Sequence, residues 1–441
     1  MAGYLIQTDG RPLADVQRQL RKYLPGLDAR LFPVGPDRAL LRGHLLEALQ
    51  REYTAPPAVW LSVLGIQAPH LLRDDEIPAL LRTRDIDALP ALKPPMPAPV
   101  GTLDWHLDMV RAPAAWQLLG GPGNIAWGTT RVAQLDTGYT RHPAFGFGAG
   151  ATTWVDTAHA RTDMPPPPNG GGNAFQPPEP GMGLDPVTGF NGGHGTRIGA
   201  TLSGYDLMAD GRPYYGVAPQ VPHLPIRMTD AVWINHAQRQ FAAGLDYAVQ
   251  QGAGVVNVSL GVVLGQVIPE MKRALDRAYE AGVIVVCAAG NYVDPVVAPA
   301  RLSRTVAVAG VTAKEQPWSG SSFGPEVDFS APAADLRRAD PRSATKFRYA
   351  GGGDGTSYAT AITSGAAALW LTYRRQGIAA AYGGLAWCVA EAFRVLARQT
   401  ARVPNSTWQA GAFGSGILDI AALLAAPLPD PASLTKAPQV Q

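Results

Sequence analysis

The sequence predicts an α/β protein with a doubly wound, mostly parallel sheet and helices on both faces, preceded by a small N-terminal α+β domain. Two observations predict the large sheet: short apolar runs typical of buried strands recur after residue 101, and segments of helical periodicity lie between them. A third observation predicts the small domain, because strand-like and helix-like segments already alternate within residues 1–65.

The N-terminal segment predicts a β-α-β-β-α-β order. Residues 4–7 have the composition of a strand, and Leu13, Val16 and Leu20 follow at helical spacing. A hairpin-like pair, a second helical stretch and a last strand complete the order, at residues 29–34, 38–42, 44–52 and 58–64. Proline then becomes frequent, which predicts a linker. We therefore expect an N-terminal domain at 1–90, a linker at 91–100, a large domain at 101–425 and a C-terminal tail at 426–441.

The large domain shows four apolar runs that predict buried parallel strands and two segments that predict helices. The strands are expected at residues 131–135, 255–258, 283–287 and 305–308, and the helices at 238–250 and 268–281. Residues 156–191 are rich in proline and glycine, so we expect a long surface loop there.

Composition excludes several classes of protein. A formal net charge of +2 gives no electrostatic reason to expect binding to nucleic acid or to an anionic membrane. No apolar stretch is long enough to span a membrane, and no signal peptide is recognisable, so we expect a soluble, cytoplasmic protein. Cys287 and Cys388 lie in apolar surroundings, which favours small buried hydrophobes over a disulfide.

Polar residues follow three of the predicted strands. Asp136 begins an Asp-Thr-Gly turn, Asn291 follows the strand at 283–287, and Ser259 begins a Ser-Leu-Gly segment. Ligands of open parallel sheets bind at the carboxyl ends of the strands, so these residues are expected at one cleft.

A histidine and a serine complete a catalytic pattern. His194 is flanked by glycines and precedes an apolar helical stretch, whereas the other seven histidines lack that setting and are expected to be structural or on the surface. Ser357 lies between a glycine cluster and an alanine-rich stretch, where it is either a helix N-cap or a nucleophile. The chain order Asp…His…Ser is one in which the serine hydrolase triad recurs. An aspartic peptidase is excluded, because no second Asp-Thr-Gly or Asp-Ser-Gly occurs.

Several segments resemble those of the subtilisin-like serine peptidases (subtilases), in the right order over about residues 101–421. They are VAQLDTG, NGGHGTRIGATLSG, VVNVSLG, VIVVCAAGN and GTSYATAITSGAAAL. The resemblance implies that Ser357 is the nucleophile, His194 its base, Asp136 the carboxylate that orients the imidazole, and Asn291 an oxyanion-hole donor. It also implies substrate binding by Ser259, Leu260, Gly261, Ala288, Ala289 and Gly290, with the peptide lying between residues 259–261 and 232–235.

The resemblance implies a serine endopeptidase that cleaves a protein or peptide substrate, in an intracellular processing or regulatory role. No cofactor is required, and calcium, which is common in the family, stays open because no dense acidic loop is present. The N-terminal domain resembles subtilase propeptides, which implies an intramolecular inhibitor or chaperone. Apolar residues after Asn291 suggest a hydrophobic side chain at the P1 position of the substrate.

The sequence departs from the family in three places. Ala361 stands where a proline is usual, Arg197 stands where a second histidine is usual, and the loop at 156–191 is long for its position. None removes a catalytic group, although the loop borders the cleft and could gate access or contact a partner.

Two other functions are considered. A catalytically silent subtilase-like binding module is disfavoured because all four catalytic residues are present. A nucleotide-binding protein is disfavoured because Gly120 to Gly123 precede a strand instead of following one, so a phosphate would meet no helix N-terminus.

Overall fold

The computed structural model describes residues 104–148, 151–162, 182–188, 191–263, 266–293 and 295–440, together with the backbone of four short N-terminal strands. The chain divides into two compact units. One contains Met1–Ala98 with Gly189–Asn191, and the other contains Pro99–Thr188 with Gly192–Gln441.

The first unit contains a four-stranded antiparallel sheet in the order β2-β3-β1-β4. Its strands are β1 (Gly3–Gln7), β2 (Ala29–Pro33), β3 (Arg38–Gly43) and β4 (His70–Leu72). The two expected helices and the strand expected at 58–64 lie outside the described residues, so the β-α-β-β-α-β order stays a prediction.

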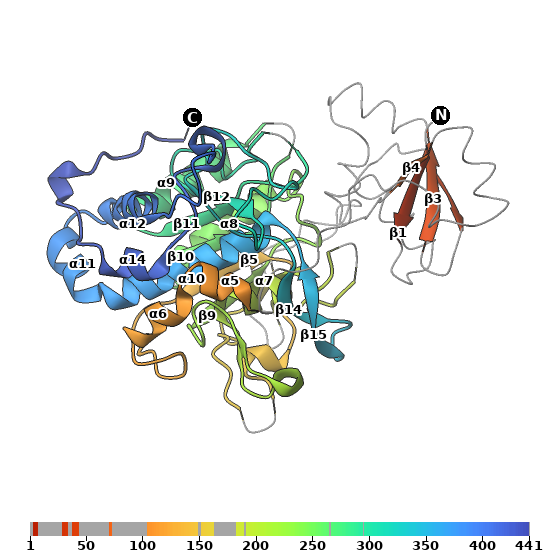
Figure 1. The fold of residues 1–441 in the computed structure, drawn as a ribbon, viewed down its shortest axis with the longest axis horizontal. Helices are drawn as coiled ribbons and strands as arrows, with labels where there is room; N and C mark the ends of the chain where they lie inside the picture. Colours follow the sequence, from red (N-terminus) through yellow and green to blue (C-terminus); the bar gives the residue numbers. More distant parts are fainter. Residues whose placement is uncertain are drawn as a thin grey trace. The chain divides into compact units, whose positions relative to one another are not determined.

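The second unit is built on a seven-stranded sheet in the order β13-β12-β11-β10-β5-β9-β6, in which every described pair of neighbours is parallel (Figure 1). The chain enters the sheet at β5 and adds strands on both sides of it, so β5 and β10 flank the topological switch point. This confirms the doubly wound fold. The strands are β5 (Val132–Asp136), β6 (Arg161–Thr162), β9 (His223–Arg227), β10 (Val255–Val258), β11 (Ile284–Ala288), β12 (Val306–Val311) and β13 (Phe329–Pro332).

Helices and two small antiparallel ribbons complete this unit. The ribbons are β7 (Tyr205–Asp206) with β8 (Tyr214–Tyr215), and β14 (Leu336–Pro341) with β15 (Phe347–Gly353). None of the described helices is long and apolar enough to cross a membrane. The α-helices are α5 (Trp105–Met109), α6 (Ala112–Gln117), α7 (His194–Ser203), α8 (Gln238–Gln250), α9 (Pro269–Glu280), α10 (Thr356–Tyr373), α11 (Arg375–Tyr382), α12 (Trp387–Thr400), α13 (Ala410–Phe413) and α14 (Ile420–Ala425). Three single turns of 3₁₀ helix are η1 (Pro143–Phe145), η2 (Ala209–Gly211) and η3 (Pro431–Ser433).

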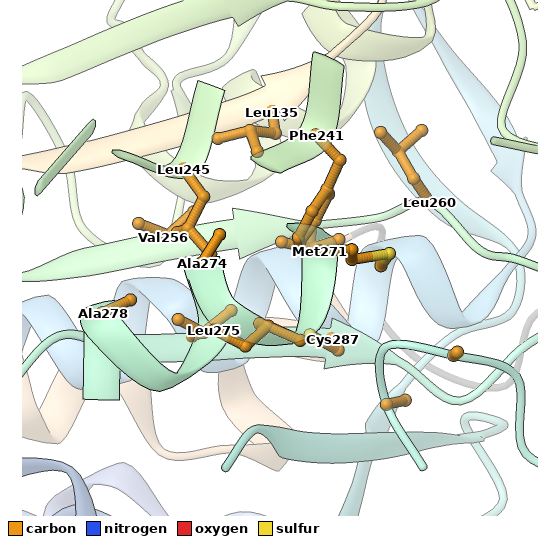
Figure 2. Close-up of a cluster of buried hydrophobic side chains, with 14 of the residues drawn as sticks. Leu135, Phe241, Leu245, Val256, Leu260, Met271, Ala274, Leu275, Ala278 and Cys287 are labelled. Carbon is orange, nitrogen blue, oxygen red and sulfur yellow. The ribbon is translucent and has the colours of Figure 1, made fainter. Parts of the chain in front are cut away.

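One face of the sheet is covered by α8 and α9. Figure 2 shows apolar side chains of both helices packed against the central strands. Full burial of each large apolar side chain contributes about 1.5–3 kcal/mol relative to its exposure. The residues drawn there include Leu135, Phe241, Leu245, Val256, Leu260, Met271, Leu275 and Cys287, all fully or almost fully buried.

Residues that alternate with these along the strands turn to the opposite face, which α7 and α10 cover. Gln134 Nε2 in β5 donates to the carbonyl of Gly195 in α7 at 3.0 Å. Ser364 Oγ in α10 donates to Asn257 Oδ1 in β10 at 3.0 Å. Because side chains alternate along a strand, one polar residue in each of β5 and β10 is directed at the helices α7 and α10.

The central helix α10 is buried on all sides from Thr356 to Trp370. It can approach the neighbouring backbone because its residues are small. A Cβ atom at Gly365 would lie 2.9 Å from Val217 Cβ, a distance that leaves no room for a larger residue.

Both cysteines are free and buried, which confirms the expectation that they are small buried hydrophobes.

The predicted C-terminal tail is packed against the rest of the second unit. Arg304, with a side chain only 3% exposed, donates to the carbonyls of Ala437 and Pro438 and pairs with Asp276 at 2.9 Å. Val440 is 8% exposed.

Three of the other histidines, His106, His142 and His223, are buried. Burial lowers the pKa of His106 to about 3, and burial lowers the pKa values of His142 and His223 to about 4. Burial also raises the pKa of Asp328 to about 6, with Arg394 and the Ala307 N–H opposing that rise.

These pKa shifts predict a pH-dependent stability. Between about pH 6.5 and 4 the unfolded chain binds three histidine protons that the folded chain does not, while the folded chain binds one extra proton at Asp328. These four groups give a difference of about two protons, which Asp104 and Asp185 reduce because burial raises their pKa values in the folded chain. The free energy of unfolding should therefore fall by at most about 2.7 kcal/mol for each unit by which the pH is lowered near pH 5. Urea denaturation between pH 7 and pH 4.5 measures this slope. A slope of zero, or stability that rises as the pH falls, would contradict it.

Candidate functional site

The carboxylate of Asp136 lies at the carboxyl end of β5, beside the switch point, and is 1% exposed. Its Oδ1 accepts the Thr137 N–H at 2.7 Å, and its Oδ2 accepts Gln134 Nε2 at 3.2 Å. Gln134 also holds the Gly195 carbonyl, so one amide joins β5 to the first turn of α7. These bonds fix the carboxylate in one orientation.

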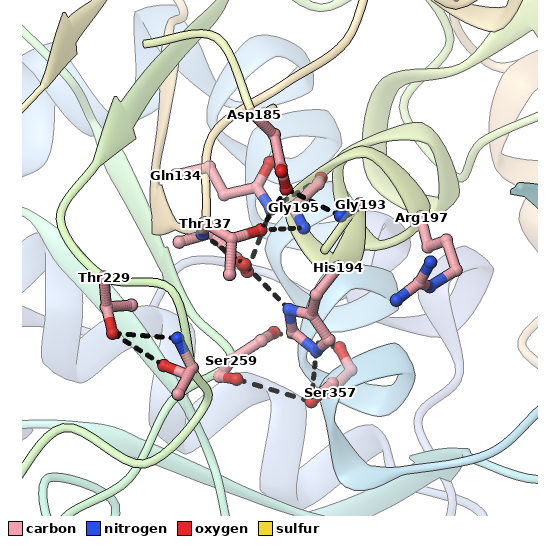
Figure 3. A network of polar contacts seen from close by, with 12 residues as sticks. Gln134, Thr137, Asp185, Gly193, His194, Gly195, Arg197, Thr229, Ser259 and Ser357 are labelled. Atoms are coloured by element: carbon pink, nitrogen blue, oxygen red, sulfur yellow. Dashed lines mark hydrogen bonds and ion pairs between the residues drawn. The ribbon is translucent and has the colours of Figure 1, made fainter. Parts of the chain in front are cut away.

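His194 is the first residue of α7, and Figure 3 shows its ring beside Ser357. Its Nδ1 is 2.7 Å from Asp136 Oδ1, and its Nε2 is 3.3 Å from Ser357 Oγ. A carboxylate only accepts hydrogen bonds, so the proton of the neutral ring lies on Nδ1. Nε2 can then accept the serine proton.

Glycine residues allow the start of α7 to contact the Asp-Thr-Gly turn after β5. A Cβ atom at Gly195 would lie 2.0 Å from the Gly138 carbonyl oxygen, so only glycine fits there. Gly193, the residue before the histidine, has φ +78°, a left-handed conformation that favours glycine. The glycines around His194 therefore bring the start of α7 against the Asp-Thr-Gly turn.

Ser357 is the second residue of α10 and is 6% exposed. Its hydroxyl is 3.3 Å from His194 Nε2 and 3.4 Å from the Ser259 carbonyl oxygen. One O–H donates to one of these acceptors at a time, so rotation of a single hydroxyl moves its proton toward the imidazole. The Ser259 hydroxyl in turn donates to the Ser357 carbonyl at 3.1 Å, which ties the end of β10 to the start of α10.

Asn291 follows β11, and its side-chain amide has a fixed direction. The Thr356 N–H and the Thr356 hydroxyl both donate to Asn291 Oδ1, each at 2.9 Å. The opposite amide atom, Nδ2, faces the turn before the serine, since a Cβ atom at Gly355 would lie 3.4 Å from it. The Thr356 N–H is thus engaged by Asn291, and the Tyr358 N–H by the Gly355 carbonyl, so the Asn291 amide N–H groups and the Ser357 N–H are the candidate donors beside the serine hydroxyl.

Asp185 is a buried residue of this candidate site that the sequence interpretation missed. Its carboxylate is 3% exposed and accepts the Thr137 hydroxyl at 2.6 Å and the N–H groups of Gly193 and Val187 at 2.7 Å each (Figure 3). Burial raises the pKa of Asp185, and these hydrogen bonds oppose the rise. The Thr137 hydroxyl also accepts the Gly195 N–H at 2.9 Å. Asp185 thus connects the residue after Asp136 to the residue before His194.

The sequence gives little sign of this role. Asp185 lies in a proline- and glycine-rich stretch nine residues before His194, where an aspartate is typical of a turn. The one signal in the sequence is Thr137, directly after Asp136. A threonine hydroxyl that is buried at this position needs a hydrogen-bond partner elsewhere in the chain.

The predicted substrate segment at 259–261 is already paired within the protein. The Gly261 N–H donates to the Val232 carbonyl at 2.9 Å, and the Ile234 N–H donates to the Gly261 carbonyl at 2.9 Å. The two expected walls therefore touch at Gly261, and a peptide strand enters between them only if Val232 and Ile234 move away. Ser259 and Leu260 are each 2% exposed.

Ala288 is the last residue of β11, and Ala289 and Gly290 follow it and lead to Asn291. Ala288 is 5% exposed and Ala289 is fully buried, with its N–H bonded to the Val308 carbonyl. Gly290 has φ +120°, and a Cβ atom there would lie 2.6 Å from Ser322 Oγ. Their role along a substrate pocket stays a prediction.

Ala361 and Arg197, the two residues that differ from those usual in the family, both fit their surroundings. Ala361 is fully buried in α10. Arg197 donates to the Gly192 carbonyl at 3.2 Å and lies 3.6 Å from a carboxylate oxygen of Asp340.

In the described part of the chain, no three His, Cys, Asp or Glu side chains are grouped so as to hold a metal ion. Calcium binding stays an open expectation.

A family model, Peptidase_S8 (subtilase family), matches residues 129–416. The thermostable alkaline protease of Halalkalibacterium halodurans is 30% identical over 269 residues, which cover 61% of this chain and 62% of that protein. Subtilisin DY of Bacillus licheniformis is 31% identical over 185 residues, 41% of this chain and 64% of its own length. The major intracellular serine protease of Bacillus subtilis is 28% identical over 283 residues, 63% of this chain and 77% of that protein. The matches thus span slightly under two thirds of the first two relatives.

Two solved structures share the fold. A protease from Pseudoalteromonas arctica PAMC 21717 superposes with a TM-score of 0.57 at 22% identity, over 73% of this chain and 96% of that one. MycP1, solved with its N-terminal propeptide removed, superposes with a TM-score of 0.53 at 22% identity, over 75% of this chain and 100% of that one.

Loss of the Asp185 carboxylate should slow the reaction of Ser357 with a serine-directed fluorophosphonate. In Asp185→Asn an amide N–H₂ replaces one oxygen and faces a donor, so the start of α7 shifts. A displacement of His194 by about 1 Å corresponds to a roughly 10²-fold loss of rate. Labelling rates measured over a pH series test this, because a displaced base changes the pH profile as well as the rate.

Asp156→Asn is the matched control. Asp156 is a turn carboxylate bonded to His159, outside this network, and its loss should leave the labelling rate unchanged. Thr137→Val should reproduce the Asp185→Asn defect, because it breaks the same connection. A folded Asp185→Asn protein that is labelled at the wild-type rate would contradict the positioning role.

Proposed function

Because this chain belongs to the subtilase family, we propose that it is a serine endopeptidase that hydrolyses peptide bonds with Asp136, His194 and Ser357. The observation that carries the proposal is the position of His194, with one ring nitrogen 2.7 Å from Asp136 and the other 3.3 Å from Ser357. This is the arrangement in which an imidazole both removes the serine proton and is oriented by a carboxylate.

In the acylation half of the reaction, Ser357 Oγ attacks the carbonyl carbon of the scissile bond while its proton passes to His194 Nε2. The carbonyl oxygen becomes an oxyanion, for which Asn291 Nδ2 and the Ser357 N–H are the proposed donors. Loss of one such donor costs about 10²–10³ in rate, a size known from the corresponding asparagine of subtilisin. His194 then protonates the leaving amine as the C–N bond breaks, and the acyl group stays on the serine.

In deacylation, His194 again acts first as a base and then as an acid, with water as the nucleophile in place of Ser357. Water takes the place of the leaving amine, His194 accepts its proton, and the resulting hydroxide attacks the ester carbon. His194 returns that proton to Ser357 Oγ as the acid product leaves. Asp136 stays ionised throughout and stabilises the imidazolium that forms in both halves.

Substrate binding requires the cleft wall to open. We propose that a peptide adds as a strand along residues 259–261 once Val232 and Ile234 separate from Gly261. Ala288, Ala289 and Gly290 then form one wall of the P1 pocket, and the apolar residues after Asn291 favour a hydrophobic P1 side chain.

The finer biological role is proposed from the relatives. The similarity to the major intracellular serine protease of Bacillus subtilis supports an intracellular processing or regulatory role. The presence of an N-terminal propeptide in MycP1 supports a role for residues 1–90 as an inhibitor or folding chaperone of the enzyme. No cofactor takes part in the proposed reaction.

A fluorophosphonate probe should label the protein at Ser357, because only a serine with an adjacent base attacks the phosphorus atom at a useful rate. The Ser357→Ala variant should not be labelled, and it should not cleave peptides that the wild type cleaves. Intact and peptide-level mass spectrometry locate the label. The matched control is Ser364→Ala, a change in the same helix that leaves the nucleophile in place.

Absence of label on a folded wild-type protein would contradict the proposal and favour a catalytically silent binding module. The same samples reveal whether residues 1 to about 100 are removed, since cleavage there changes the intact mass. If the wild type removes this segment and Ser357→Ala retains it, the processing is autocatalytic.

A further inference from the structure

The side chain of Val297 lies between the two segments that are proposed to line the P1 pocket. A Cβ atom on Gly261, at the end of segment 259–261, would lie 2.7 Å from Val297 Cγ2. A Cβ atom on Gly290, at the end of segment 288–290, would lie 2.9 Å from Val297 Cγ1. Carbon atoms that are not bonded to one another prefer separations of about 3.5–4.0 Å. One methyl group of Val297 therefore packs against each glycine, and neither glycine has room for a side chain.

The backbone around Val297 is hydrogen-bonded to both segments. The Val297 N–H donates to the Ala289 carbonyl at 2.9 Å. The Val262 N–H, directly after segment 259–261, donates to the Ala298 carbonyl at 2.7 Å. These two bonds hold Val297 in place, so residues 297 and 298 form the floor of the space between the two segments.

The two segments also contact the start of α10, where the proposed nucleophile lies. The Ser259 hydroxyl donates to the Ser357 carbonyl at 3.1 Å, and the Gly290 N–H donates to the Thr356 hydroxyl at 3.3 Å. In the proposed reaction Ser357 Oγ attacks the carbonyl carbon of the P1 residue, and the oxygen of that carbonyl group is directed at Asn291 Nδ2. The P1 Cα atom is bonded to the same carbon. The P1 side chain therefore begins beside these two segments.

Little open space remains between the two segments. Four residues of these segments are at most 5% exposed, namely Ser259, Leu260, Ala288 and Ala289. Val297 is also 5% exposed, although a deep pocket above it would leave its methyl groups accessible to water. The space that receives a P1 side chain is therefore shallow.

The residues on either side of Val297 point elsewhere. Val296 and Ala298 both belong to the apolar core between the sheet and helices α8 and α9. Val296 Cγ2 lies 3.3 Å from the position that a Cβ atom on Gly324 would occupy. The substrate segments are thus contacted by the side chain of Val297 and not by that of Val296.

We propose that Val297 limits the P1 residue of the substrate to alanine or glycine. A longer P1 side chain would have to displace the methyl groups of Val297, and extra carbon atoms forced into a packed space cost free energy. The hydrophobic P1 side chain proposed above is therefore a small one. This inference rests on the proposed peptidase function, and it defines the substrates as protein segments that are cleaved after alanine or glycine.

Internally quenched peptides that differ only at P1 test the proposal. Gly, Ala, Leu or Phe is placed at P1, and kcat/KM is measured for each peptide with the wild-type protein. We expect the Ala peptide to be cleaved about 10–100 times faster than the Leu and Phe peptides, the usual size of discrimination by an apolar pocket against extra carbon atoms. Leu and Phe peptides that are cleaved as fast as the Ala peptide would overturn the inference.

The Val297→Ala variant removes both methyl groups from the floor of the pocket. It should raise kcat/KM for the Leu and Phe peptides about tenfold relative to the Ala peptide. Val296→Ala is the matched control, because it removes the same two groups from the neighbouring valine, and it should keep the wild-type ratio. Fluorophosphonate labelling of Ser357 identifies the variants that retain a reactive nucleophile. A labelled Val297→Ala protein with the wild-type ratio would contradict the role of Val297.

Binding to the Ser357→Ala variant separates this inference from the proposed function. Fluorescence anisotropy with the same peptides, prepared without the quencher, should show tighter binding of the Ala peptide than of the Leu and Phe peptides. Equal binding and equal cleavage of these peptides, on a protein whose Ser357 is labelled, overturn the inference alone. An unlabelled wild-type protein whose Ser357→Ala variant still prefers the Ala peptide would overturn the peptidase proposal alone.

Discussion

The hydrogen bond between His194 Nδ1 and Asp136 Oδ1 is the interaction on which the rest of the site depends. It is 2.7 Å long and lies at the end of the central strand β5. Because the carboxylate only accepts, this bond selects the ring tautomer that leaves Nε2 free for Ser357. If the ring rotated or changed tautomer, Ser357 would lose its proposed base, although every side chain of the proposed triad would still be present.

The fold supplies that bond through close backbone contacts. The start of α7 reaches the turn after β5 because Gly195 touches Gly138, and Gln134 and Asp185 then connect the two segments through side-chain hydrogen bonds. The start of α10 reaches the end of β10 through reciprocal contacts between Ser259 and Ser357. Three segments distant in sequence are thereby fixed at one switch point.

The bounds of helices and strands could be predicted closely from the sequence, because the pattern that indicates them lies within each segment. Helix α8 has the predicted bounds, and α9 starts one residue late because Pro269 occupies the first helical position, where no N–H is needed. Strand β5 extends to Asp136 because its backbone pairs with Arg227, which the apolar pattern does not show. The missed features are long-range. The Asp185 bonds, the pairing of Gly261 with Val232, and the anchoring of the C-terminal segment by Arg304 join residues whose proximity only the folded chain defines.

Histidine-selective ¹⁵N NMR tests the central bond most directly, with His194→Gln to assign the resonance. At a pH where the His194 ring carries a single proton, the structure predicts that this proton lies on Nδ1, strongly deshielded and slowly exchanging, and that Nε2 carries none. In Asp136→Asn that deshielded proton should disappear, because the ring loses its carboxylate acceptor. A His194 ring that carries its proton on Nε2 in the folded wild-type protein, or one unaffected by Asp136→Asn, would contradict the account.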